Sequence, residues 1–385
     1  FRPEKERLAQ LGATLRFPVS FFLGDDPEEI SPDIVSFRSM SKMTAGERDS
    51  AIGAGEIALM LNDWIEQRFD LPQADLPDLS QEASPEAAAD TLRRMWGLGE
   101  LPIKNMIHLL EAKGVRVFSL AIDTVQLDAF SMWHAATPFV FLNTQKSCEH
   151  SRFDAAHELG HLVLHRHAGS KGQEAEREAN AFASAFLMPR ASVLSNAPHM
   201  ATVDQLVRAK RFWTVSVAAL AHRLHDVDLV SAWHYRSLCI ELAKRGYRKA
   251  EPNEAPRETS QVLAKVFAAL REEGTSKADV AAALSIHVVR PSNSVNIRVI
   301  IERARKAPRH TCGPAPKARW RRALSRRMSK VSGFSNTAGS RLAAANDTTT
   351  LSPRCSVRPP SSTSRVAVRR KVITGVHQRS ISSTA

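Results

Sequence analysis

Two histidines and a glutamate in this chain have the types and the spacing of a zinc-dependent hydrolytic site. His157, Glu158 and His161 stand in the order H-E-x-x-H, within the segment SRFDAAHELGHLVLHRHAG of residues 151–169. On a helix, residues four apart lie about 6 Å apart along the axis on one face, so both imidazoles can reach one ion. Glu158 follows the first histidine, and its carboxylate can take a proton from a water at the metal instead of binding the ion.

The motif requires a helix, and the surrounding residues predict one. Apolar residues recur at the spacing of one helix face, roughly opposite the histidines: Ala155, Leu159, Leu162 and Val163. Ser151 followed by Asp154 is typical of an N-terminal capping box, and Gly169 is a suitable stop at the other end. We therefore expect a helix that begins near Ser151.

A third ligand is needed, and the sequence offers three candidates. His165 follows His157 by eight residues, about 12 Å along a helix, which is too far for two ligands at about 2 Å from one ion. His167 has the third-ligand position of H-E-x-x-H-x-x-G-x-x-H, but that pattern needs a glycine where this chain has Leu164. Glu176 is the candidate that remains, and we favour it.

Glu176 lies in a second predicted helix, EAEREANAFASAFLMP, which Pro189 closes. The apolar face of this helix consists of small, aromatic and aliphatic residues: Ala179, Phe182, Ala183, Phe186 and Leu187. Its alanines would let it approach the motif helix closely at Gly160. Asn180 lies four residues after Glu176 on one flank, where its amide can orient a ligating histidine. Two histidines, one glutamate and an open fourth position are typical of a catalytic Zn2+ site.

The residues H-E-L-G-H-L-V-L-H, followed by E-x-x-A-N-x-F-A-x-x-F-L-M-P, resemble the ImmA/IrrE-type family of bacterial and phage zinc peptidases. The resemblance covers roughly residues 101–189, including PFVFLN at 138–143 and the Arg-Phe pair at 152–153. It implies a gluzincin-related zinc metallo-endopeptidase, with ligands and general base at the positions named above: His157, His161 and Glu176, and Glu158. Members of the family cut helix-turn-helix repressors and are often fused to such DNA-binding domains. The resemblance therefore implies a transcriptional repressor as the protein substrate, and a role in transcriptional regulation or stress response.

The chain as a whole predicts an α+β, mostly helical fold, in which a small three-stranded sheet packs on a zincin-type pair of active-site helices. Strands are expected at 115–120, 128–133 and 139–142, and helices at 45–69, 84–96, 102–113, 203–212, 215–225 and 237–244. An edge strand could pair with an extended substrate, and His134 could line that cleft. Four further residues are open candidates for stabilising the oxyanion: His222, His225, His234 and Tyr235.

We divide the chain into five segments. They are a remnant of an N-terminal helix-turn-helix domain (1–24), a helical segment (25–100), the zinc metallopeptidase core (101–200), a C-terminal helical domain (201–288) and a basic tail (289–385). Because the chain begins at Phe1 rather than methionine, residues 7–22 are interpreted as the last helix and exit strand of a truncated phage-repressor-type (XRE-like) domain. An ordinary N-terminal helix is the alternative. DNA is a further partner through such a domain.

Basic residues elsewhere raise the question of nucleic-acid binding. Residues 202–224 have a two-helix-and-turn pattern, with Lys210, Arg211 and Arg223 available for phosphates, although a solvated helix face is the more common reading. Residues 290–385 hold 21 Lys and Arg against Glu302 and Asp347, a net charge of +19, and residues 1–289 carry −6. This Arg/Ser/Pro-rich tail lacks apolar periodicity, so we expect disorder. It is either a nucleic-acid-binding arm or the product of a shifted reading frame, and the second is favoured.

Localisation and function class follow from what the sequence contains. The four cysteines are far apart without a C-x-x-C pair, which favours free thiols in a reducing cytoplasm. No apolar run of about 18 residues predicts a membrane span. Three functions are weighed: a zinc endopeptidase acting on a regulatory protein, a DNA-binding transcriptional regulator with a zinc-sensing or inactive peptidase-like domain, and a helical core with an accidental motif. The additional presence of Glu176 and Asn180 favours the first over the third.

Overall fold

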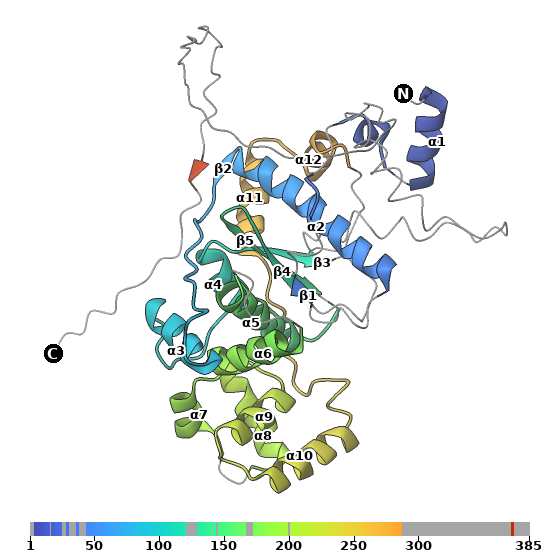
Figure 1. Ribbon diagram of the computed structural model, residues 1–385. Coiled ribbons are helices and arrows are strands. Elements are labelled where there is room, and N and C mark those ends of the chain that lie inside the picture. Colours follow the sequence, from blue (N-terminus) through green and yellow to red (C-terminus); the bar gives the residue numbers. More distant parts are fainter. Residues whose placement is uncertain are drawn as a thin grey trace, which may run out of the picture. The chain divides into compact units, whose positions relative to one another are not determined.

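Helices surround a small mixed sheet in the computed structural model (Figure 1). The structure describes residues 4–15, 17–24, 28–30, 36–37, 44–120, 129–143, 145–166, 172–198, 201–286 and 371–372. The predicted disordered tail lies outside these residues, except for β6 (Lys371–Val372), which pairs in parallel with β2 (Phe69–Asp70). Within the described ranges, no helix combines the length and the apolar character needed to cross a bilayer.

The sheet that lies over the motif helix has the strand order β1-β4-β5-β3. Its central strand β5 (Thr137–Asn143) pairs in parallel with β3 (Arg116–Leu120) and antiparallel with β4 (Ala129–His134). These three strands confirm the predicted sheet, with ends that differ by one or two residues. A fourth strand, β1 (Ser36–Phe37), pairs with β4 at Phe130 and Ser131. The sequence analysis missed β1 because two residues are too short for a periodic pattern.

Alternating side chains give the sheet two different faces. On one face, four phenylalanines of β3, β4 and β5 stack near the small residues of α2 (Ala45–Glu66): Phe118, Phe130, Phe139 and Phe141. The residues between them, Val117, Val140 and Leu142, belong to the apolar cluster of α5 (Cys148–Leu164) on the other face. Because Phe130 and Met132 of β4 join the α2 cluster, Ser131 points toward α5.

The motif helix α5 begins three residues earlier than predicted. Its N-cap is Ser147, whose hydroxyl accepts a hydrogen bond from the backbone N–H of His150. The predicted capping box of Ser151 and Asp154 is therefore wrong, because both residues already lie inside the helix. At the other end α5 stops at Leu164, and the predicted stop at Gly169 lies outside the described residues.

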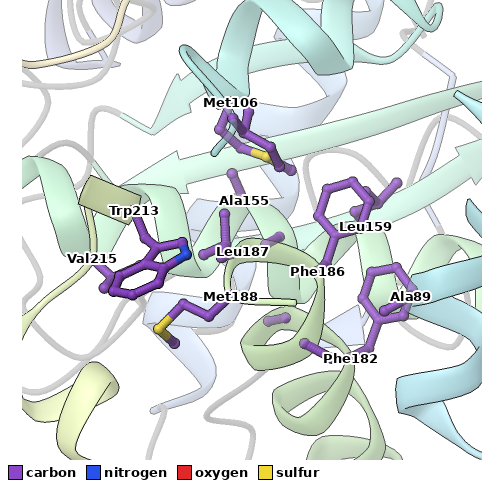
Figure 2. Packing of buried hydrophobic residues seen from close by; sticks show 14 of the residues in the cluster. Ala89, Met106, Ala155, Leu159, Phe182, Phe186, Leu187, Met188, Trp213 and Val215 are labelled. Atoms are coloured by element: carbon purple, nitrogen blue, oxygen red, sulfur yellow. The ribbon is translucent and has the colours of Figure 1, made fainter. Parts of the chain in front are cut away.

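A second helix, α6 (Gln173–Leu187), packs directly on α5 at Gly160. A Cβ atom added at Gly160 would lie 3.1 Å from Cδ1 of Phe182 and 3.3 Å from Cα of Ala179, which confirms the close approach expected from the small residues. Figure 2 shows Ala155 and Leu159 of α5 in one apolar cluster with Phe182 and Phe186 of α6. The side chains carried by the two helices are therefore held within reach of one another.

Replacing Gly160 by valine is expected to lower the free energy of unfolding by about 1–3 kcal/mol, because the added methyl groups force α5 and α6 apart. Urea denaturation of purified protein measures this loss. Gly53→Val is the matched control, since a Cβ at Gly53 in α2 meets nothing within 4 Å. Equal unfolding midpoints for the two variants would contradict the close packing at Gly160.

Two buried arginines hold the C-terminal end of α6. Arg93 of α3 (Pro85–Met95) donates to the carbonyl of Phe186 at 2.5 Å, and Arg223 of α9 (Val217–Asp226) donates to the carbonyl of Met188 at 2.9 Å. Cations are favourable at a helix C-terminus, where carbonyl groups lack intrahelical partners. Their hydrogen bonds fix the axial position of α6, and with it the position of Glu176 in its first turn.

The N-terminal end of α5 is held by buried ion pairs. Lys210 of α8 (Val203–Trp213) lies 2.7 Å from Glu149 and 3.1 Å from Glu251, and Arg152 pairs with Glu258. Lys210 and Arg223 are 1% and 3% exposed, so they are not available to phosphates. The prediction that both could contact DNA is wrong, because each neutralises a buried or partly buried carboxylate.

The remaining helices complete the described part of the chain. They are α1 (Lys5–Leu15), a 3-10 helix (Val19–Phe22), α4 (Met106–Ala112), α7 (Arg190–Asn196), α10 (Ala232–Lys244), α11 (Gln261–Glu272) and α12 (Lys277–Ala283). The expected exit strand at 17–22 is instead this 3-10 helix. One apolar cluster runs from Leu76 to Leu242 across the predicted boundary at residue 200, so the core does not mark that boundary, and the domain division stays a prediction.

Candidate metal centre

Three side chains from α5 and α6 converge on one point. Nε2 of His157 lies 3.1 Å from Nε2 of His161. The two carboxylate oxygens of Glu176 lie 3.4 Å from His157 Nε2 and 3.3 Å from His161 Nε2. Ligand atoms about 2.0–2.1 Å from a tetrahedral zinc ion are about 3.3–3.4 Å from each other, so these separations fit a shared zinc ion. The structure thus brings together the three ligands that the sequence predicted.

Each imidazole is also held from its other ring nitrogen. Nδ1 of His157 lies 3.1 Å from Oδ1 of Asn180, whose amide donates to the carbonyl of Glu176 at 2.7 Å. Nδ1 of His161 lies 3.0 Å from Nδ1 of His165. The sequence analysis set His165 aside as a ligand and gave it no other role. Its position four residues after His161 was the signal that it could contact that ring.

Glu158 is fully buried beside the three ligands, and its two oxygens have different surroundings. Oε2 accepts a hydrogen bond from the Ser131 hydroxyl at 2.6 Å. Oε1 has no hydrogen-bond partner among the described residues. Burial raises the pKa of Glu158 to about 7, although His161 and Ser131 act in the opposite direction. A carboxylate with a pKa near neutrality is suited to accept and return a proton.

The carboxylate of Glu176 has the opposite electrostatic balance. Burial favours its neutral form, but the imidazoles of His157 and His161 beside it outweigh burial and lower the pKa of Glu176 to about 2. Glu176 is therefore ionised at neutral pH, which is the form that binds a metal ion. Two glutamates near one point thus differ in their acid–base behaviour, and they suit the two different roles predicted for them.

Ser131 is a site residue that the sequence analysis missed. No motif surrounds it, and a serine on a strand is usually a solvated residue. The available signal was its alternation with Phe130 and Met132, which places a lone polar side chain on the opposite face from two apolar ones. Only the packing of that face against α5 shows that its partner is Glu158.

Replacing Ser131 by alanine is expected to lower the turnover of a peptidase by about 10–100-fold, because a hydrogen bond to a charged group contributes about 1.5–3 kcal/mol. Ser131→Thr keeps the hydroxyl and should restore most of the rate. The measurement is the rate of substrate cleavage at equal zinc content. If Ser131→Ala and Ser131→Thr have the same rate, the hydroxyl does not hold Glu158 for catalysis.

The other residues considered in the sequence have partners elsewhere in the described structure. His134 is the last residue of β4, and its Nε2 lies 3.3 Å from Oε2 of Glu28. The oxyanion candidates contact residues of α8–α10 and their loops: His222 with Asp226, His225 stacked on Tyr235, and His234 with the carbonyl of Ala201. His167 lies outside the described residues. In the described part of the structure, no hydrogen bond, ion pair or ring contact given for these candidates reaches the metal centre, so the choice among them stays open.

A helix carrying H-E-x-x-H, a neighbouring helix whose Glu176 faces both histidines, and a strand whose Ser131 holds Glu158 form the arrangement expected of a metallopeptidase site. The comparison with protein families agrees, because residues 110–225 match the IrrE N-terminal-like domain, Peptidase_M78. This part of the chain is therefore a Peptidase_M78 domain, and the predicted resemblance is confirmed. The match runs through α8 and to residue 225 of α9, so it continues beyond residue 189, where the resemblance noted in the sequence ended.

The comparison with protein families provides no support for the predicted N-terminal helix-turn-helix domain. No helix-turn-helix domain was matched, so the truncated N-terminal domain stays a prediction. None of the curated proteins searched matches the chain.

Proposed function

We propose that this chain is a zinc-dependent metallo-endopeptidase that hydrolyses a peptide bond in a regulatory protein, such as a helix-turn-helix transcriptional repressor. The observation that carries the proposal is the convergence of His157, His161 and Glu176 within a Peptidase_M78 domain, with the buried carboxylate of Glu158 beside them. The donor set is typical of catalytic rather than structural zinc, because it has three protein ligands of the His2Glu type.

The residues of the chain divide the work of peptide hydrolysis. A zinc ion bound here would supply a Lewis acid that polarises the scissile carbonyl and lowers the pKa of water. Glu158 accepts the proton of the attacking water through Oε1 and delivers it to the leaving amine nitrogen. Ser131 holds Oε2 of the same carboxylate, and Oε1, which has no hydrogen-bond partner among the described residues, is left for this task. Asn180 keeps the His157 ring in place.

Substrate binding as an added strand is consistent with this sheet, with one restriction. Of the three long strands, β4 lies on the outside of the group and contacts Glu158 of the candidate metal centre through Ser131. Peptide groups bind well to the edge of such a strand. From the sequence we expected an edge strand to pair with substrate, without naming the strand, and β1 already pairs with β4 at Phe130 and Ser131. An extended substrate would therefore pair with β4 beyond Ser131 or replace β1.

Cleavage of a purified repressor tests the proposal. The full-length chain would be mixed with a cognate helix-turn-helix repressor, and the products separated and identified by mass spectrometry. We expect two fragments that are absent after treatment with a metal chelator and that reappear when zinc is added back. An intact repressor under all conditions would contradict peptidase activity toward this class of protein.

Co-expression of the two proteins in cells with a reporter for the repressor's promoter tests the second function considered. If the repressor stays intact while its promoter becomes active, the chain acts by binding rather than by hydrolysis. A DNA-binding regulator with a zinc-sensing or inactive peptidase-like domain would then be the better description.

A further inference from the structure

Two consecutive hydrogen bonds, from His161 to His165 and from His165 to Glu178, lie behind the His161 imidazole at the ring nitrogen that does not face Glu176. Nδ1 of His161 is 3.0 Å from Nδ1 of His165, and Nε2 of His165 is 2.7 Å from Oε2 of Glu178. His165 is the C-cap residue that follows Leu164 at the end of α5, and Glu178 lies on α6. The same two helices that carry the metal ligands are therefore joined a second time, by a pair of side chains that are not ligands.

The carboxylate of Glu178, which is the last acceptor in this series of hydrogen bonds, determines which ring nitrogens carry hydrogen. A carboxylate only accepts hydrogen bonds, so the hydrogen between Glu178 and His165 belongs to Nε2 of His165. A neutral imidazole carries one hydrogen, so Nδ1 of His165 has a lone pair and accepts from Nδ1 of His161. Nε2 of His161 is then left with a lone pair, which is the form of histidine that binds a metal ion.

The His157 ring is held in the same tautomer by a different device. The amide of Asn180 donates through Nδ2 to the carbonyl of Glu176, so Oδ1 is the atom that faces Nδ1 of His157. Asn180 is a neutral acceptor, whereas the hydrogen bonds behind His161 end on the carboxylate of Glu178. A carboxylate that accepts a hydrogen bond behind a ligating histidine, here through His165, increases the basicity of that ligand.

We propose that His165 and Glu178 are positioning residues that fix the tautomer of His161 and strengthen the binding of zinc. The proposal rests on the proposed function in one respect, namely that zinc is the metal held by His161. Loss of such an outer partner typically lowers the affinity for the metal about 10–100-fold. The contribution of His165 and Glu178 is therefore measurable as zinc affinity, without reference to any substrate.

The test is the dissociation constant for zinc, measured by competition with a chromogenic chelator on the full-length chain. His165→Phe keeps a ring but removes the acceptor, and we expect zinc binding about 10–100-fold weaker. His165→Asn places a carbonyl oxygen near the position of Nδ1 and should recover most of the affinity. Glu178→Gln, which loses the charge but keeps an acceptor, should fall between wild type and His165→Phe.

Glu174→Gln is the matched control for Glu178→Gln, because Glu174 is an exposed carboxylate on the same helix. Its zinc affinity should equal that of the wild type. Thermal unfolding of each metal-free variant shows that the fold is retained. Glu178 is partly exposed, so Glu178→Gln carries the test should His165→Phe fail to fold.

The outcomes separate this proposal from the peptidase function. Zinc affinities of His165→Phe and Glu178→Gln within twofold of wild type would overturn the role of His165 and Glu178, whatever the activity. Tight zinc binding that depends on both residues, together with an uncleaved repressor, would support their role and count against the peptidase function. A wild-type chain that does not bind zinc would overturn both.

Discussion

Replacing Glu158 by glutamine is expected to lower the rate of repressor cleavage about 10²–10⁴-fold, which is the usual contribution of a general acid–base residue. The amide has nearly the same volume as the carboxylate, so the buried position beside Ser131 can accept it. An amide does not take a proton from water at neutral pH. The variant should therefore bind zinc and fold like the wild type while it leaves the repressor intact.

Co-expression of the chain with a helix-turn-helix repressor, followed by immunoblotting for repressor fragments, measures this effect. Glu174→Gln is the control, since it makes the same chemical change at an exposed position of α6 and should cleave at the wild-type rate. Persistent loss of the repressor in cells with Glu158→Gln at normal zinc content would mean that hydrolysis by this site is not the mechanism.

His157→Ala is expected to abolish stoichiometric zinc binding. Three protein ligands hold the ion in a site of this type, and alanine removes one of them from the centre of a buried cluster. Purified wild-type protein should contain one zinc ion per chain by elemental analysis, and the variant should contain close to none. The repressor should also remain uncleaved, because Glu158 alone cannot polarise the peptide carbonyl.

His150→Ala provides the comparison for this loss. His150 is on the same helix, two turns before His157, and its side chain is 44% exposed. Equal zinc content in His150→Ala and the wild type would show that the loss in His157→Ala is specific. Wild-type protein without stoichiometric zinc would instead support the third possibility, an ordinary helical core with an accidental motif.

The ligand set could be proposed from sequence because its geometry is local. His157 and His161 are one helical turn apart, and a pattern of residues three and four apart predicts a helix wherever it occurs. Glu176 required a further step, the pairing of two helices through Gly160 and small residues. That step succeeded because a glycine facing alanines permits few other arrangements of two amphipathic helices.

Predicted helix ends were less accurate, for reasons that particular residues make clear. Ser151 and Ser147 are both suitable N-caps by residue type, and the sequence analysis chose the wrong one. The helix predicted at 102–113 begins only at Met106, where the side chain of Asn105 caps the first turn and Glu258, far away in the sequence, accepts from two of its backbone N–H groups. Partners supplied by distant segments leave no signal in the local pattern.

The chemistry of this protein could be inferred from residue types and their spacing: two imidazoles and two carboxylates, on two helices, with the spacing of a metallopeptidase site. How that chemistry is supported depends on tertiary packing. It brought Ser131 from a strand to Glu158, and it aligned His165 with Glu178 behind His161. It also buried Lys210 between two glutamates where the sequence suggested a cation for DNA. Helical periodicity is encoded over a few residues, whereas each of these contacts depends on how separate elements pack.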